Sequence, residues 1–166
     1  QERLLILMER RFGRLLAAEV ARASRVMLQQ YEATGAAPSL PLDHVQIMAQ
    51  IYQQMTLVAV EAFGGRIVGQ GKSRGLLLET KSFKDFFRRL AAEYIGREAI
   101  RRRITNVSEY TRAEIVKKIT RGQSEGLGTQ AIAKLIRDSI FGASQDRAAR
   151  IARTETHGAA NYGADG

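Results

Sequence analysis

The chain has 166 residues, no cysteine and a formal net charge of +9, and these values exclude several classes of protein. Without cysteine there is no disulfide framework and no cysteine-ligated zinc site, and no apolar run reaches the roughly 18–20 residues that span a bilayer. The basic excess favours polyanionic partners, chiefly nucleic acid, or acidic protein surfaces.

The first predicted element is a long helix over residues 2–34. Its apolar side chains recur every three or four residues and form one stripe: Met8, Phe12, Leu16, Val20, Ala23, Met27 and Tyr31. Gly35 is expected to end this helix. The stripe is not a clean heptad, so the spacing favours packing within a bundle over an extended coiled coil.

A second helix is predicted over residues 42–63, with Pro41 near its first turn and Gly64-Gly65 at its end. Asp43 is expected to cap it, and the neighbouring His44 ring to be solvated. The loop over residues 36–41 is short enough for an antiparallel pair of helices. We therefore predict a helical hairpin arm over residues 1–65, followed by a glycine-rich hinge over residues 66–81.

Residues 82–166 are predicted to form a compact, basic unit of four helices, over residues 83–104, 108–121, 130–141 and 145–161. The fold class is therefore all-α. Residues 84–166 hold 16 basic and 10 acidic side chains, a net charge of +6. One basic face is a candidate for sequence-independent phosphate contacts: Arg89, Arg97, Arg101, Lys117 and Lys118. The alternative is a solvated face with no partner.

The last predicted helix carries an acid on its apolar side. At 100° per residue, Glu155 shares one face with Ala148, Ile151, Ala152 and Ala159. Because an unpaired buried charge costs several kcal/mol, Glu155 is predicted to be buried and paired. Its partner is expected to be an Arg of a neighbouring helix, or the backbone N–H groups where the helix after Thr129 begins.

Two functions are open for this segment. In the first, it is a structural lock within the C-terminal unit, formed by residues 151–155: Ile151, Ala152, Arg153, Thr154 and Glu155. Arg153 is then expected to contact residues of that same unit. In the second, Glu155 and Arg153 belong to a transferase or hydrolase site, but no second catalytic group accompanies them. His44 and His157 lie far apart and form no metal-ligand pair. We therefore predict no enzyme activity, no metal and no cofactor.

The same segment carries a family resemblance. The run from Arg147 to Thr156, followed by Ala159 to Gly163, resembles the closing signature of the Mu-F-like head morphogenesis proteins of tailed phages. Residues 119–133 resemble the helix, glycine turn and Ile-Ala helix that precede this signature at a similar spacing. The similarity covers residues 82–163, whereas residues 1–80 match only in being helical.

The resemblance implies a minor head protein, a structural component of the virion or procapsid that is made in the host cytoplasm. Its implied partners are the portal protein, the capsid proteins and packaged double-stranded DNA. We further expect the N-terminal arm to dock on the portal or on neighbouring copies, and, because no apolar run is long enough to span a bilayer, we expect no membrane contact. The alternative is a free-standing, sequence-independent DNA-binding protein. Family members are often longer, so either the protein is short or the chain is a fragment; the start at Gln1 favours a fragment.

Overall fold

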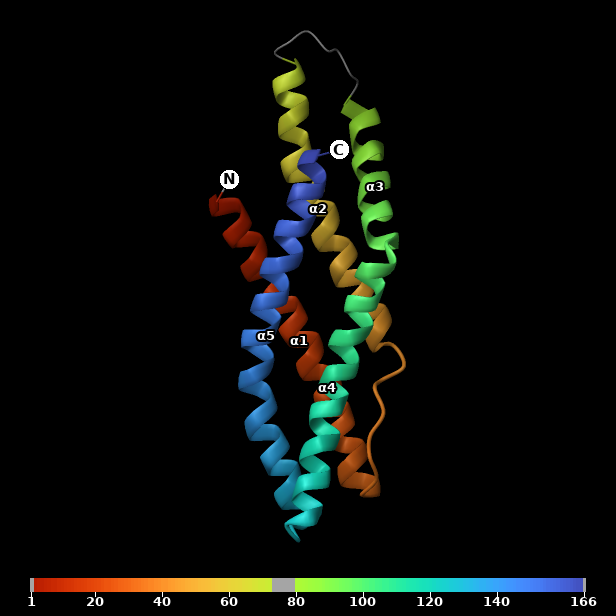
Figure 1. Ribbon diagram of the computed structural model, residues 1–166, viewed down its shortest axis with the longest axis vertical. Helices are drawn as coiled ribbons and strands as arrows, with labels where there is room; N and C mark the ends of the chain where they lie inside the picture. Colours follow the sequence, from red (N-terminus) through yellow and green to blue (C-terminus); the bar gives the residue numbers. More distant parts are fainter. Residues whose placement is uncertain (1, 73–79, 166) are drawn as a thin grey trace.

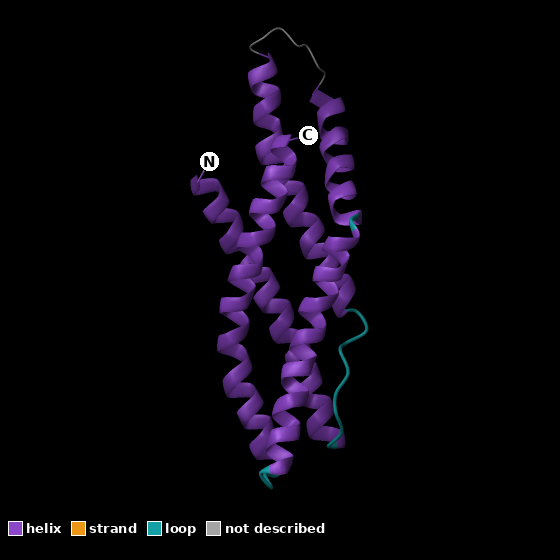
Figure 2. Ribbon diagram, viewed as in Figure 1, coloured by secondary structure: helices purple, strands orange, loops and turns teal. Residues whose placement is uncertain are grey.

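The computed structural model describes the backbone of residues 2–72 and 80–165, and the side chains of residues 2–64, 85–139 and 145–164. Within these residues every regular element is a helix (Figure 2), so the predicted all-α class is confirmed. The helices are α1 (Glu2–Thr34), α2 (His44–Lys72), α3 (Thr80–Gly96), α4 (Glu98–Ser124) and α5 (Thr129–Asp165).

The long helices lie side by side along the longest axis of the molecule (Figure 1). Helix α1 runs against α2 in the opposite direction, as predicted, and packs along α5. The predicted apolar stripe of α1 is buried throughout, and Gly35 ends the helix with a positive φ of 66°. The loop that follows is fixed to α4, because the Arg112 Nε donates a hydrogen bond to the Pro38 carbonyl at 3.2 Å.

Helix α2 does not end at Gly64-Gly65, as the sequence predicted, but continues to Lys72. Gly64 instead allows a side chain of α3 to approach the α2 backbone closely. A Cβ atom at this position would lie 2.2 Å from Cε1 of Phe87, so α3 packs directly on the α2 backbone. Of the predicted hinge over residues 66–81, residues 66–72 are helical and residues 73–79 lie outside the described part of the chain.

The other predicted helix ends also shift. The break expected near residues 105–107 lies at Arg97, whose extended backbone (φ −61°, ψ 132°) follows Gly96. Val107 lies within α4 and is buried in the core, and this burial favours a helix that continues through residues 105–107. In the last part of the chain, α5 continues through Gly142 where two helices were expected. A helical glycine costs about 1 kcal/mol, which the packing of α5 along α1 and α2 outweighs.

Two hydrophobic clusters form the core, and both halves of the sequence contribute to each. The larger combines residues of all the named helices, among them Phe12, Tyr52, Tyr94, Ile104 and Ala152. The smaller joins α1, α4 and α5 near the α4–α5 turn. Helices α1 and α2 therefore share their cores with α4 and α5, while the division into arm, hinge and bundle stays a prediction.

Two glycines in helices are expected to respond in opposite directions to the same substitution. At Gly13 the nearest atom to an added Cβ would lie at 3.5 Å, an ordinary contact, so Gly13→Ala should raise the free energy of unfolding by about 0.5–1 kcal/mol. At Gly122 an added Cβ would lie 2.5 Å from Cγ1 of the buried Ile132, so Gly122→Ala should lower it by about 1–2 kcal/mol. Urea unfolding measures both values, and a stabilising Gly122→Ala would contradict this account of α4–α5 packing.

Candidate functional site

Glu155 is buried between α5 and α4, as the sequence predicted. Only 4% of the residue is exposed, and Arg103 Nη1 lies 3.0 Å from Oε1 and 3.3 Å from Oε2 of its carboxylate. The charge of Glu155 raises the pKa of Arg103 above its ordinary value. The partner is thus an Arg of a neighbouring helix, which was the first of the two expected possibilities.

Arg153 contradicts the expectation that it contacts its own C-terminal unit. Its Nε lies 3.4 Å from Oε2 of Glu9 on α1, and His157 Nε2 lies 2.9 Å from Oε1 of the same carboxylate. Two residues along a helix turn by about 200°, so Arg153 and Glu155 face different neighbours. The run over residues 151–155 therefore joins α5 to α1 on one side and to α4 on the other.

The other residues of the run over 151–155 differ in burial, because each successive residue points in a different direction around the helix. Ala152 is fully buried in the larger core, next to Gly13 of α1, and Ile151 is half-buried beside it. Thr154 is exposed. This distribution fits a packing role for the run, and the structural-lock interpretation stays a prediction that stability measurements decide.

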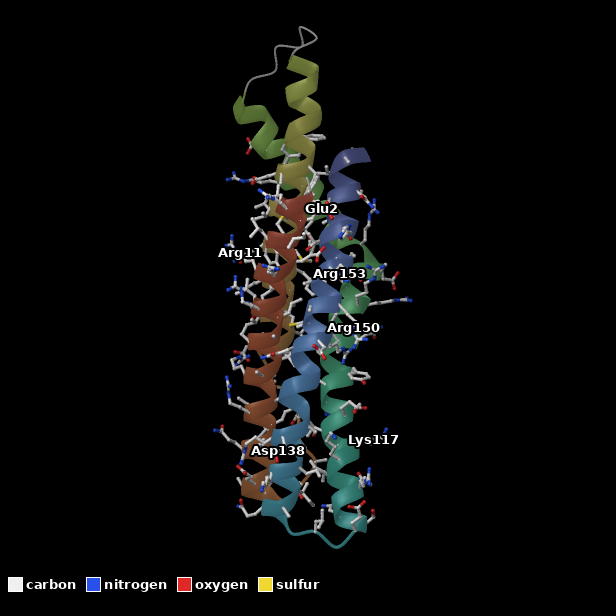
Figure 3. The ribbon with its side chains drawn as sticks, turned by 90° about the vertical axis from the view of Figure 1, so that its left-hand side faces the viewer. Glu2, Arg11, Lys117, Asp138, Arg150 and Arg153 are labelled. Carbon is white, nitrogen blue, oxygen red and sulfur yellow. The ribbon has the colours of Figure 1, made fainter. Side chains whose placement is uncertain are left out.

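A groove of about 340 Å³ lies beside the Glu155 pair and is lined by α2, α4 and α5. Its polar lining consists of Tyr52, Arg103, Asn106, Arg147, Arg150 and Thr154, together with Glu155. In Figure 3, Arg150 projects from α5 on the side of α4. Three guanidinium groups against one carboxylate make this groove electropositive.

Arg147 is held in the groove by an aromatic contact. Its guanidinium carbon lies 3.6 Å from the ring centroid of Tyr110, a cation–π arrangement. Burial lowers the pKa of Arg147 from its ordinary value, and the like charge of Arg150 lowers it further. At the inner end of the groove, burial raises the pKa of Tyr52, and the charge of Glu155 raises it further. The groove therefore combines an excess of guanidinium over carboxylate groups with a hydroxyl donor.

The phosphate-contacting face predicted from the sequence is not gathered into one small area. Arg89 lies on α3, and Arg97 lies over the Tyr162 ring at 4.3 Å, so that part of its surface is engaged. Arg101 and Lys117 are exposed on α4 but lie about 24 Å apart along the helix axis. Lys118 is half-buried. A long polyanion could contact several of these residues, whereas a single phosphate could not.

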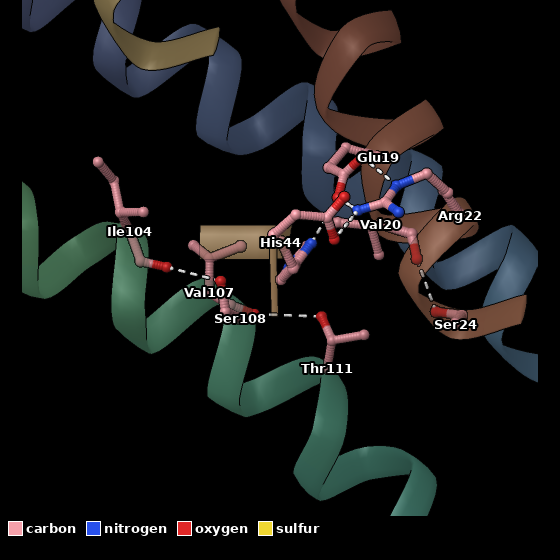
Figure 4. A network of polar contacts seen from close by, with 10 residues as sticks. Glu19, Val20, Arg22, Ser24, His44, Ile104, Val107, Ser108 and Thr111 are labelled. Atoms are coloured by element: carbon pink, nitrogen blue, oxygen red, sulfur yellow. Dashed lines mark hydrogen bonds and ion pairs between the residues drawn. The ribbon is translucent and has the colours of Figure 1, made fainter. Parts of the chain in front are cut away.

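A second polar cluster lies between α1 and the start of α2 (Figure 4). His44 is fully buried, not solvated as predicted, and its Nδ1 lies 2.7 Å from Oε1 of Glu19. Arg22 donates two hydrogen bonds of 2.8 Å to the Glu19 carboxylate and one of 2.9 Å to Asp43. Asp43 thus pairs with α1, and Arg22 lowers the pKa of this carboxyl. The cluster fixes the entry of the chain into α2.

Sequence reasoning missed both the groove and the His44 cluster. Part of the groove is visible in the spacing, because Arg147, Arg150 and Thr154 share one helical face, as do Arg103 and Asn106. No local signal brings Tyr52 to the same place. Among the described residues, no group of three or more His, Cys, Asp or Glu side chains is arranged to hold a metal ion.

None of the described helices combines the length and apolar character that crossing a membrane requires. The comparisons with known proteins returned no match to a family model, a curated protein or a solved structure.

Proposed function

We propose that this chain is a minor head protein of a tailed phage, a structural component of the virion or procapsid. The observation that carries the proposal is the run Ile151-Ala152-Arg153-Thr154-Glu155, which resembles the closing signature of that family. In the structure this run joins α5 to α1 through Glu9 and to α4 through Arg103. Both contacts hold neighbouring helices together, so the role proposed for this run is structural.

The proposed partners are the portal protein, the capsid proteins and packaged double-stranded DNA. A net charge of +9 supports contact with DNA or with acidic inner surfaces of a shell. Near the start of α1, Leu7 is 62% exposed and Ile6 is also exposed, which supports self-association through the N-terminal helix. The proposed location is the head interior or the region between head and neck, after synthesis in the host cytoplasm.

Co-sedimentation tests this proposal directly. The tagged chain, produced together with the portal and shell proteins encoded beside it, should sediment with procapsids and should be recovered with isolated portal. A charge-matched control, such as a basic helical protein of similar size, should stay in the supernatant. Absence of the chain from both procapsids and virions would reject the proposed function.

A sequence-independent DNA-binding protein is the second candidate, and the basic residues spread along α3 and α4 favour it. In this case the affinity for duplex DNA should fall steeply with salt, with a log–log slope of about −0.9 for each phosphate neutralised. Fluorescence anisotropy with two unrelated duplexes should give the same slope and the same affinity. Absence of binding at about 50 mM salt would exclude this second candidate.

A further inference from the structure

We propose that the groove between α4 and α5 binds a phosphate group between Arg147 and Arg150, with the Tyr52 hydroxyl as a further donor. The site is independent of the phage assignment, because it is argued from the side chains of the groove alone. Three observations carry it: the charge balance of the groove, an unpartnered buried hydroxyl and the origin of the donors on two helices that line the same groove.

The charge balance leaves two guanidinium groups without a carboxylate at ion-pair distance among the described residues, although the charge of Glu114 acts on Arg147. Arg103 is neutralised by Glu155, at 3.0 Å. Among the described residues, neither Arg147 nor Arg150 has a carboxylate at ion-pair distance, although both line the same groove. Burial lowers the pKa of Arg147 most, and the like charge of Arg150 lowers it further; an anion between the two groups would relieve this repulsion.

The Tyr52 hydroxyl supplies the second observation. Tyr52 is only 1% exposed and lines the groove from α2, yet its hydroxyl oxygen has no hydrogen-bond partner among the described residues. A buried hydroxyl without a partner costs about 1–3 kcal/mol. A tyrosine hydroxyl is protonated at neutral pH, and burial raises the pKa of Tyr52 further, so the hydroxyl can donate to an anion. A bound phosphate oxygen would satisfy it.

The arrangement of the donors favours phosphate over a carboxylate. Phosphate oxygens point in tetrahedral directions, so one group can accept from donors on two helices, whereas a carboxylate presents its two oxygens in one plane. Arg147 and Arg150 come from α5 and Tyr52 from α2. One guanidinium group can donate two parallel hydrogen bonds to the oxygens of one phosphate. The exposed Asn106 and Thr154 add polar groups at the rim of the groove. The phosphate can be a free ion or a backbone phosphate of nucleic acid.

Calorimetric titration with inorganic phosphate at constant ionic strength tests the site. We expect saturable binding that Arg150→Gln weakens at least tenfold, because a charged donor is lost. Tyr52→Phe should weaken it about threefold or more. The matched control is Arg25→Gln, which removes an exposed Arg of α1 outside the groove and should bind phosphate as the unchanged chain does. Lack of saturable binding, or an equal loss in Arg25→Gln, would overturn the proposal.

A second arm distinguishes the two sources of phosphate and uses a short DNA duplex with the same variants. If the groove takes a backbone phosphate, Arg150→Gln should weaken duplex binding more than Arg25→Gln and reduce the salt slope by about 0.9. If it takes the free ion, both variants should weaken duplex binding equally, while only Arg150→Gln loses inorganic phosphate. The Arg150→Gln chain should still sediment with procapsids. If the unchanged chain binds phosphate but does not sediment with procapsids, the phage assignment is rejected and the phosphate site is retained.

Discussion

Glu19→Ala is expected to lower the free energy of unfolding by about 3–5 kcal/mol. The Glu19 carboxylate is 6% exposed and is the shared acceptor of His44 and Arg22. Removing it leaves the fully buried His44 ring without a partner on either nitrogen, since Nε2 has none among the described residues. The loss therefore includes the cost of leaving buried polar groups unsatisfied.

The matched control is Glu32→Ala, which also removes a glutamate of α1 that pairs with an Arg. Its partner Arg137 is about half exposed, and the pair lies at the surface. Exposed ion pairs contribute about 0–1 kcal/mol, so this variant should unfold almost as the unchanged chain does. Urea unfolding, monitored by circular dichroism, compares the free energies of unfolding of the two variants. Equal losses in the two variants would mean that the His44 cluster does not fix the start of α2.

Arg103→Met is expected to lower the free energy of unfolding by about 2–3 kcal/mol. The substitution keeps an apolar stem on α4 but leaves the Glu155 carboxylate unpaired in a site where it is only 5% exposed. Breaking a buried pair costs about 3–5 kcal/mol. The Arg103 side chain is 51% exposed, so water can partly replace its guanidinium as a partner of the carboxylate. The expected loss in free energy of unfolding therefore lies below that range.

Arg102→Met provides the control for Arg103→Met, because Arg102 is the preceding residue of the same helix. Its ion pair with Glu98 is largely exposed on both sides, and its loss should change stability by less than about 1 kcal/mol. Glu155→Gln combined with Arg103→Met should cost less than the sum of the two single variants, as expected for two residues in direct contact. Additive losses would contradict the structural-lock interpretation of residues 151–155.

The sequence predicted those features that depend on residues close together in the chain. The apolar stripe of α1 and the end of this helix at Gly35 follow from periodicity and turn chemistry, and both are confirmed. The burial of Glu155 was also predictable, because its position relative to Ala148, Ile151 and Ala152 places it on the inner face of any helix formed there.

Glycine positions misled the prediction of helix ends because a glycine has two uses. It ends a helix where the backbone needs a positive φ, as at Gly35, and it allows close approach where another helix crosses. Gly64 lies against Phe87 and Gly122 lies against Ile132, and each of these two glycines is inside a helix and does not end it. Local sequence does not distinguish the two uses, because the crossing partner is distant in the chain.

By itself, the sequence determined the helical class, the buried faces and the basic charge, since these depend on composition and on spacing along one helix. Only the tertiary structure decided which groups meet: Glu155 with Arg103, Arg153 with Glu9, and His44 with Glu19. It also brought Tyr52 to Arg147 and Arg150 in one groove. The physical reason is that periodicity fixes the direction of a side chain around its own helix, whereas a partner depends on how helices far apart in sequence pack against each other.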